Sequence, residues 1–251
     1  MLVSTRREKI KEIILKKKAV KVSELCEIFK VSDETIRRDL EELERQGLIE
    51  RNYGGAVLKE NIVVPPLVKR FKEHIEEKQR IAAKAVTEIK EGNVIFLDAG
   101  STTYHIAKAI KSLKGITVIT NALNVATELS TNPEINLFIT GGKLKHDNQS
   151  MVGFETVNCI GKYNIDILFL GTGGISVEKG LTTSDIFEAE AKKAMIRSAS
   201  RVIVVADSSK FGKVAMVSFA TFNDIEKIIT AGEENREIVE QLTEYVKIEI
   251  V

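Results

Sequence analysis

The sequence lacks the features of a secreted, membrane-bound or metal-centred protein. Its two cysteines, Cys26 and Cys159, lie far apart without CxxC spacing, and its three histidines form no ligand pair, so we expect neither a disulfide framework nor a metal site. No apolar run is long enough to cross a bilayer, and no apolar segment of the signal-peptide kind follows the charged N-terminal residues. We therefore expect a cytoplasmic protein with no membrane contact.

Net charge and nucleotide-binding motifs are also scarce. The formal net charge is +1 although 29% of the 251 residues are charged, so any surface for nucleic acid must be local. The chain contains no GxxxxGK[ST] motif and no GxGxxG motif at its first strand–helix turn, and we therefore expect no nucleotide cofactor. Apolar residues make up 43% of the chain, which is enough to form a core and argues against disorder.

The chain length suits a small domain followed by a medium-sized one. Pro65-Pro66 marks the boundary, because a Pro-Pro pair does not fit inside a helix or a central strand. We predict a first domain over residues 1–58, a linker over 59–70 and a second domain over 71–251.

The first domain has the pattern of three short helices and a hairpin. Thr5–Glu8 fits a capping box, while Ser23 and Ser32 are suited to N-cap the second and third helices. Gly47 follows the third helix as a C-terminal glycine, and residues 52–55 have the composition of a hairpin turn. This order of elements is the plan of a winged helix-turn-helix.

The third helix presents polar donors opposite its apolar face. Ile36, Leu40 and Leu43 share one side, which leaves the start of the helix exposed. Hydroxyl and guanidinium groups suit phosphates and guanine edges. The predicted DNA-binding residues are Ser32, Thr35, Arg37, Arg38 and, beside the wing, Arg51. The alternative is a solvated charged helix in a protein-interaction module.

The second domain alternates short apolar runs with turns and helical stretches. After a helix-rich stretch over 71–89, the predicted strands are 94–97, 117–119, 137–139, 165–170, 202–205, 228–230 and 246–251. Short continuous apolar strands separated by helices predict an α/β domain with a mainly parallel sheet covered on both faces.

The turns after these strands carry the chemistry of the second domain. Because parallel strands end at one edge of a sheet, we expect these turns to meet in one crevice. Residues 100–103 open a helix whose free N–H groups suit a phosphate, Lys210 adds a positive charge, and the polar side chains suit sugar hydroxyls. The predicted effector site comprises Asp98, Gly100, Ser101, Thr102, Thr103, Thr120, Asn121, Gly141, Gly142, Gly171, Gly173, Gly174, Thr182, Glu190, Lys192 and Lys210. Glu190 and Lys192 do not share a helix face, so both cannot point straight into the crevice.

Both halves of the chain resemble one family. Val31–Leu43 (VSDETIRRDLEEL), followed by 47–49 and 54–56, resembles the N-terminal domain of DeoR-family bacterial regulators. The second half resembles the sensor domain of that family in the stretches 98–103, 120–121, 141–142, 171–174, 180–182, 188–192 and 207–212. The resemblance implies a recognition helix that places Thr35, Arg37 and Arg38 on double-stranded DNA. It also implies a sensor fold similar to ribose-5-phosphate isomerase that binds a phosphorylated sugar.

These observations predict a regulator whose DNA binding a phosphorylated sugar controls. We expect a repressor that the sugar releases from its operator, and an activator is the alternative, because the sequence does not give the sign of regulation. A repeated operator half-site implies a homodimer or homotetramer. An isomerase or deaminase is the alternative, with Asp98, Glu190 or Asp207 as the base. The converging turns contain no histidine and no acid-rich run, so we expect no enzyme activity.

Overall fold

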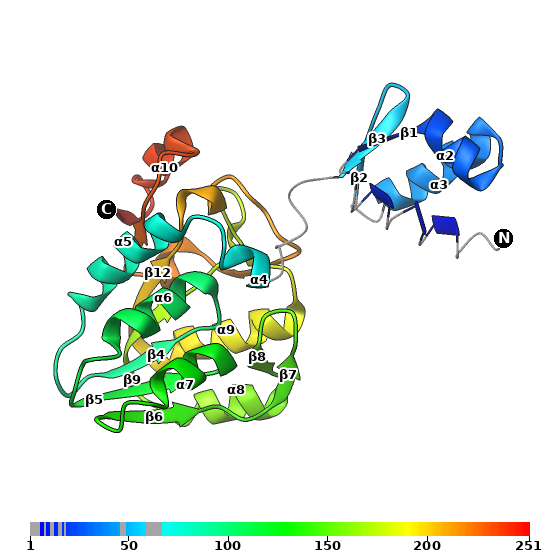
Figure 1. Cartoon of the computed structure of the whole chain (residues 1–251). Helices are drawn as coiled ribbons and strands as arrows, with labels where there is room; N and C mark the ends of the chain where they lie inside the picture. The colour runs from blue at the N-terminus through cyan, green and yellow to red at the C-terminus, as the bar shows by residue number, and fades with distance from the viewer. Residues whose placement is uncertain are drawn as a thin grey trace. The chain divides into compact units, whose positions relative to one another are not determined.

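The computed structural model describes residues 6–7, 9–10, 13–14, 17, 19–45, 49–58 and 67–251. The chain divides into two compact units, Met1–Ile62 and Val63–Val251 (Figure 1). The predictions made for Thr5, Glu8, Gly47 and Pro65-Pro66 lie outside the described residues. Within the described ranges, no helix is both long and apolar enough to span a membrane.

The N-terminal unit is a winged helix-turn-helix. Helices α2 (Val22–Phe29) and α3 (Asp33–Arg45) precede the wing strands β2 (Ile49–Asn52) and β3 (Gly55–Leu58). A strand that we did not predict, β1 (Ala19–Lys21), pairs with β3, so the antiparallel sheet has the order β1-β3-β2. The prediction that Ser23 caps the second helix was wrong, because Lys21 occupies the N-cap position and Ser23 lies in the first turn.

The core of this unit lies under α3. Ile36, Leu40 and Leu43 are buried against Ile10 and Leu25, which confirms the predicted apolar face. The burial of that face fixes which side of α3 remains exposed.

The larger unit has a seven-stranded parallel sheet of the order β15-β14-β12-β9-β4-β5-β6, as the α/β prediction required. Each strand overlaps a predicted apolar run. The strands are β4 (Val94–Leu97), β5 (Ile116–Thr120), β6 (Ile135–Ile139), β9 (Ile165–Leu170), β12 (Ala199–Val205), β14 (Lys227–Thr230) and β15 (Lys247–Ile250).

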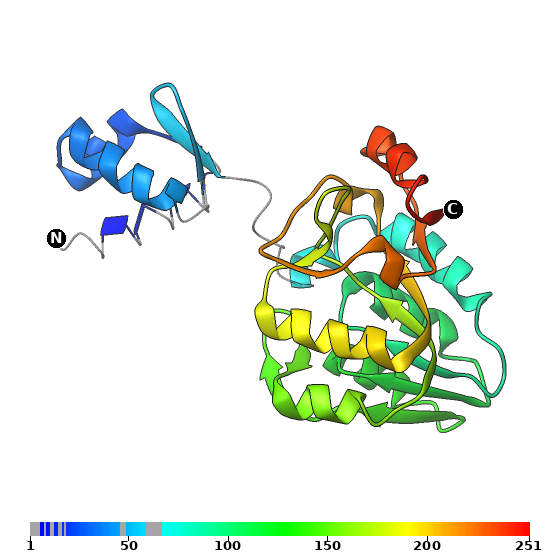
Figure 2. The ribbon, with the colours of Figure 1, turned by 180° about the vertical axis from the view of Figure 1, so that it is seen from behind.

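Helices cover both faces of this sheet (Figures 1 and 2). One face packs against α5 (Ile75–Val86), α6 (Ser101–Ile110) and α7 (Leu123–Leu129), and the other against α8 (Phe154–Ile160) and α9 (Ile186–Ser198). Alternate residues of each strand enter the two layers, as the pleat of a strand requires. In β9, Ile167 and Phe169 contact the first layer, while Leu168 and Leu170 contact the second.

Several short elements extend the carboxyl edge of the sheet. Hairpin β7–β8 (Lys143–Lys145 and Ser150–Val152) follows β6, and strands β10 (Gly174–Ser176) and β11 (Gly180–Thr183) follow β9. Strand β13 (Val217–Ala220) pairs with β11. The remaining elements are the helices α4 (Leu67–Arg70) and α10 (Arg236–Leu242) and the 3₁₀ turns η1 (Ser208–Lys210) and η2 (Phe222–Asp224). Residues 67–70, which we assigned to the linker, therefore form a helix in the second unit.

Candidate functional sites

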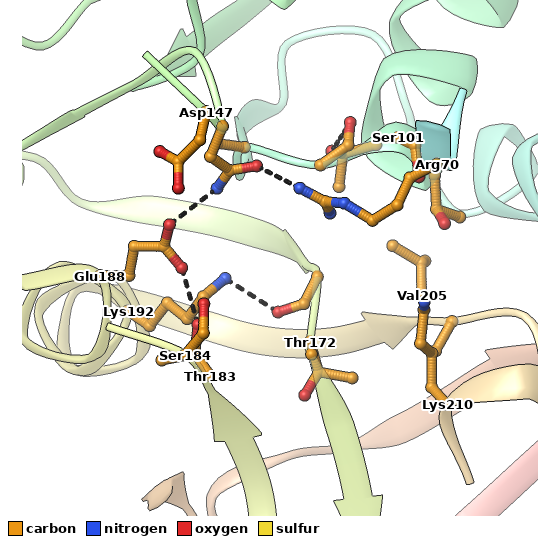
Figure 3. Close-up of a pocket in the computed structure, with 18 of the residues that line it drawn as sticks. Arg70, Ser101, Asp147, Thr172, Thr183, Ser184, Glu188, Lys192, Val205 and Lys210 are labelled. Atoms are coloured by element: carbon orange, nitrogen blue, oxygen red, sulfur yellow. Dashed lines mark hydrogen bonds between the residues drawn. The ribbon is translucent and has the colours of Figure 1, made fainter. Parts of the chain in front are cut away.

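A cavity of about 240 Å³ lies where β4, β9 and β12 end at the carboxyl edge of the sheet. Its walls come from the start of α6, the turn after β9, the start of α9, α4, η1 and the β7–β8 loop (Figure 3). The predicted effector residues that line it are Gly100, Ser101, Thr102, Thr103, Gly171, Gly173, Lys192 and Lys210. These residues are distant in sequence, and the parallel sheet brings them together as predicted.

The beginning of α6 forms one wall of the cavity. Gly100 occupies the N-cap position, and the first backbone N–H groups of an α-helix have no partner inside the helix. The hydroxyl group of Thr103 donates to the carbonyl oxygen of Gly100 at 3.1 Å, which fixes this turn. Ser101 and Thr102 are buried and line the cavity with their hydroxyl-bearing side chains. This wall offers neutral donors and the positive end of a helix dipole.

A buried ion pair supports the floor of the cavity. Lys192 forms a short ion pair with Asp98 and donates a hydrogen bond to the carbonyl oxygen of Gly171 at 2.9 Å. The backbone N–H of Gly171 donates in turn to Asp98 Oδ2 at 3.0 Å. Burial raises the pKa of Asp98, whereas the Lys192 ammonium opposes that rise. Asp98 does not line the cavity itself, so its visible role is to position Lys192.

A hydrogen-bonded chain that we did not predict forms the opposite wall (Figure 3). Arg70 Nη2 donates to Asn148 Oδ1 at 2.6 Å, and Asn148 Nδ2 donates to Glu188 Oε1 at 3.1 Å. Thr183 Oγ1 donates to Glu188 Oε2 at 2.7 Å. Burial opposes ionisation of Glu188, but the charges of Lys192 and Lys145 and the hydrogen bond from Thr183 together lower its pKa. Glu188 and Lys192 are four residues apart on α9, and this spacing was the available sequence signal.

Lys210 carries a desolvated positive charge at the cavity. Its ammonium group forms no hydrogen bond and no ion pair with the described residues, although it lines the wall (Figure 3). Burial lowers the pKa of Lys210, and the nearby Asp207 carboxylate opposes that shift. A partly dehydrated cation that lines the same cavity as a helix N-terminus is suited to bind an anion.

The structure does not bring the other predicted effector residues to this cavity. Thr120 Oγ1 donates to the carbonyl oxygen of Leu97 at 2.7 Å, and Asn121 Nδ2 donates to that of Met151 at 3.1 Å. Glu190 is exposed and pairs with Lys193 at 2.9 Å. These contacts of Thr120 and Asn121 are local, although Asn121 Oδ1 is buried without a partner among the described residues, and Glu190 lies on another side of α9.

The remaining glycines and Thr182 also have structural contacts. Thr156 Oγ1 on α8 donates to the carbonyl oxygen of Gly141 at 2.6 Å, and a Cβ atom at Gly142 would lie 2.0 Å from the same hydroxyl oxygen. Thr182 Oγ1 donates to the carbonyl oxygen of Gly174 at 3.2 Å. These contacts hold β7 against α8 and β10 against β11, outside the cavity.

The predicted DNA-binding residues lie at the start of α3, directly before it and on strand β2. Ser32 Oγ lies 2.9 Å from Thr35 Oγ1, and each of the three arginines is paired with an acidic neighbour. Arg37 pairs with Asp33, Arg38 with Glu34 at 2.6 Å, and Arg51 with Glu44 at 2.7 Å. Exposed pairs of this kind contribute only about 0–1 kcal/mol each, so exchanging them for DNA phosphates costs little.

Two features of this unit were missed by sequence reasoning. Tyr53 is fully exposed at the tip of the wing, where an aromatic side chain has no core contact to explain it. Arg6 and Arg7 contact the buried carboxylate of Asp39 on α3, at 2.6 and 2.9 Å. Arg6 is itself buried, so it is a structural residue and is not exposed to a ligand.

Comparison with known proteins gives matches over most of the chain. Residues 6–61 match the DeoR-like helix-turn-helix domain, and residues 73–232 match the DeoR C-terminal sensor domain. The HTH-type transcriptional regulator IolR of Bacillus subtilis is 35% identical over 240 residues, covering 96% of both chains. The glycerol-3-phosphate regulon repressor of Escherichia coli is 34% identical over 245 residues, covering 98% of this chain and 97% of that protein. Both relatives are named as regulators or repressors, not as enzymes.

A weaker likeness connects the structure with an isomerase. Ribose 5-phosphate isomerase A from Methanocaldococcus jannaschii aligns with a TM-score of 0.42 and 20% identity, covering 56% of both chains. We draw no functional argument from a likeness of this size.

Proposed function

Because the chain belongs to the DeoR family of transcriptional regulators, we propose that it represses a sugar-metabolism operon. We also propose that a phosphorylated sugar, bound in the cavity at the carboxyl edge of the sheet, controls its DNA binding. In this proposal, residues 1–58 bind the operator, and the larger unit, which includes α4 (Leu67–Arg70), senses the effector. The observation that carries the effector assignment is the desolvated Lys210 ammonium, which has no hydrogen-bond or ion-pair partner among the described residues and lines the same cavity as the N-terminus of α6.

The phosphate group would bind between α6 and Lys210. The N–H groups at the start of α6 and the hydroxyls of Ser101 and Thr102 supply neutral donors, and Lys210 supplies the charge. One relative is named for a glycerol-3-phosphate regulon, which supports a phosphorylated polyol as the class of effector.

The sugar hydroxyls would bind the opposite wall. Arg70, Asn148 and Glu188 form a continuous hydrogen-bonded chain there, and Lys192 lies beside it. Such a chain holds both donors and acceptors in fixed positions, as recognition of a polyol requires. Bound sugar would therefore contact α4, the β7–β8 loop and α9 together.

The operator would bind the exposed face of α3 and the wing. Ser32, Thr35, Arg37 and Arg38 lie at the start of α3, while Arg51 and Tyr53 lie on the wing. A homodimer or homotetramer would place two such units on repeated half-sites. The effector can release DNA only if it binds the DNA-competent and DNA-incompetent arrangements with different affinities.

Fluorescence anisotropy tests this proposal directly. Operator DNA selected by the protein from a random library is titrated with the full chain, alone and with glycerol 3-phosphate and pentose and hexose phosphates. We expect at least one phosphorylated compound to weaken operator binding about tenfold or more, while its unphosphorylated counterpart has no effect. If no phosphorylated compound changed the operator affinity, the effector assignment would be contradicted.

A matched variant separates the two halves of the proposal. The double substitution Arg37→Ala and Arg38→Ala should weaken DNA binding and reduce its dependence on salt, because fewer phosphate contacts release fewer counterions. The same variant should keep its affinity for the sugar phosphate. Unchanged DNA affinity and salt dependence would instead favour a protein-interaction role for α3.

A further inference from the structure

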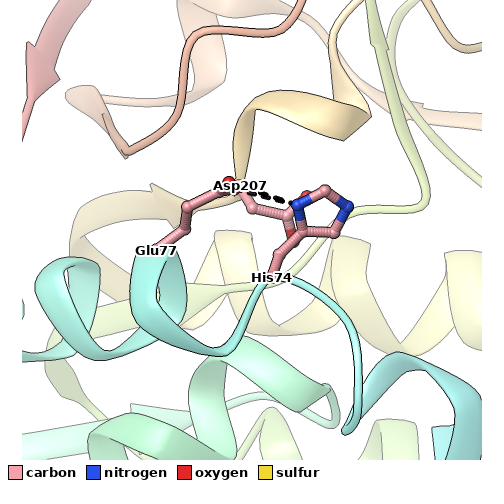
Figure 4. A group of neighbouring side chains, drawn as sticks. All are labelled: His74, Glu77 and Asp207. Carbon is pink, nitrogen blue, oxygen red and sulfur yellow. Dashed lines mark hydrogen bonds and ion pairs between the residues drawn. The ribbon is translucent and has the colours of Figure 1, made fainter.

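We propose that His74, Glu77 and Asp207 form a binding site for a divalent transition-metal ion of the Zn²⁺ type, separate from the effector cavity. One ligand atom from each of the three side chains lies within 4.8 Å of the other two. His74 Nδ1 lies 3.2 Å from the Glu77 carboxylate, and Asp207 approaches the pair from the segment after β12 (Figure 4). None of the three residues lines the cavity described above.

The carboxylate oxygens at this site are buried and incompletely paired. Asp207 is 0% exposed, and its Oδ2 atom and Glu77 Oε2 have no hydrogen-bond partner among the residues that the structure describes. Ser208 Oγ is also buried without a partner in that part of the chain. A Cβ atom at Gly232 would lie 2.3 Å from Ser208 Oγ and 2.9 Å from Glu77 Oε2, so these two oxygens approach the same point. Buried polar atoms normally have partners, and several unpaired oxygens at one place indicate a ligand.

The donor set matches the chemistry of such an ion. Imidazole nitrogen and carboxylate oxygen are both ligand types of Zn²⁺, and a hydroxyl or water can complete the coordination. His74 has a left-handed backbone conformation, with φ of 53°, at the beginning of α5. Its side chain is 25% exposed while that of Asp207 is 1% exposed, so an ion has a route from solvent to a buried carboxylate.

Lys78 is the competing cation at this site. Its Nζ atom lies 3.8 Å from Asp207 Oδ2, beyond hydrogen-bond distance. Its hydrogen bonds go instead to the carbonyl oxygens of Arg70, at 2.8 Å, and Glu73. Lys78 therefore compensates part of the charge of Asp207 but donates no hydrogen bond to the facing oxygens. Lys210 brings a second positive charge close to Asp207, so the local charges nearly balance and the three ligand atoms, rather than an excess of negative charge, would hold the ion.

A metal ion here joins two segments that are far apart in the sequence. His74 and Glu77 belong to the start of α5, whereas Asp207 directly precedes η1, which carries Lys210. A bound ion would therefore fix the position of η1 against α5. The long separation of the ligands explains why no sequence motif marks this site.

Isothermal titration of the chelator-treated full chain with Zn²⁺ tests the site. The test variant is His74→Asn, because asparagine tolerates the left-handed conformation and the backbone should be retained. The control is His146→Asn, the same change at an exposed histidine. We expect one Zn²⁺ per chain, at least a tenfold loss of affinity in His74→Asn and no change in His146→Asn.

Two results would overturn the proposal. One is the lack of stoichiometric Zn²⁺ binding, and the other is equal affinity in His74→Asn and the unsubstituted chain. Co²⁺ serves as a spectroscopic probe for the same site. Weak visible d–d bands without a thiolate charge-transfer band are expected, whereas a thiolate band would place the ion at Cys26 or Cys159 and refute the assignment.

Discussion

Replacing Lys192 by Met is the perturbation that most sharply tests how the cavity floor is built. The substitution keeps an unbranched side chain of similar length but removes the charge paired with Asp98. The side chains of Lys192 and Asp98 are only 6% and 2% exposed, so solvent screens the pair weakly. Breaking a buried pair by removing one partner costs about 3–5 kcal/mol, because the other charge remains buried without compensation.

The loss of stability in Lys192→Met depends on whether Asp98 is protonated. Burial already raises its pKa, and loss of Lys192 removes the main opposing charge, so the folded variant should bind a proton that the unfolded chain does not. The cost of Lys192→Met should therefore be largest at neutral pH and shrink as the pH is lowered. The double variant Asp98→Asn/Lys192→Met should recover most of the loss, because an uncharged amide oxygen still accepts the hydrogen bond from Gly171 N–H.

Urea unfolding of the full chain, followed by circular dichroism, measures these differences. A loss of about 3–5 kcal/mol corresponds to a melting temperature lower by about 6–20 °C in a unit of this size. The double-variant cycle isolates the pair interaction from the loss of packing. If Lys192→Met cost less than about 1 kcal/mol at pH 7, or if Asp98→Asn failed to rescue it, the buried-pair reasoning would be wrong.

Three further predictions concern stability. Gly142→Ala should lower the free energy of unfolding in urea by about 2–4 kcal/mol, because φ is +128° and a Cβ atom would lie 2.0 Å from a hydroxyl on α8. The control Gly141→Ala should be neutral, because a Cβ atom there would have no described atom within 4 Å. Equal effects of the two substitutions would refute this reasoning. Arg6→Ala should destabilise the N-terminal unit by about 2–4 kcal/mol, because the carboxylate of Asp39, which is only 1% exposed, would lose one of its paired positive charges. An unchanged melting curve would contradict the contact. Hydrogen bonds and charges from three lysines lower the pKa of Glu249 to about 2. The contribution of Glu249 to the free energy of unfolding is therefore complete above the ordinary carboxyl pKa and is lost as the pH falls toward 2. Glu249→Gln should flatten the acid limb of the stability curve.

The parallel sheet could be predicted from the sequence because its strands are buried on both faces. Runs such as Ile165–Leu170 are continuously apolar, and this pattern needs no knowledge of tertiary structure. Strands β1, β10 and β11 were missed because each has only three or four residues and shows little periodicity. Their conformation depends on pairing with distant strands, as in the contact of β11 with β13.

Apart from Lys192 on α9, the predicted residues that line the cavity follow strands of the main sheet. Lys210 and residues 100–103 fit this pattern, and the structure places them together. Arg70 was missed because it lies in the segment that we assigned to a linker, and Asn148 because it lies in an unpredicted hairpin loop. Thr120 is the last residue of β5 and donates its hydroxyl hydrogen to Leu97 of the neighbouring strand β4, a contact that its position in the sequence does not reveal.

The central claim is that Lys210 binds the phosphate of an effector in this cavity. Isothermal titration with the phosphorylated sugar that releases operator DNA tests it, using Lys210→Met and, as the control, the same change at the exposed Lys213. Loss of one charge-assisted hydrogen bond of about 1.5–3 kcal/mol predicts a 10- to 150-fold weaker affinity for Lys210→Met only. Equal affinities of the two variants would contradict the claim.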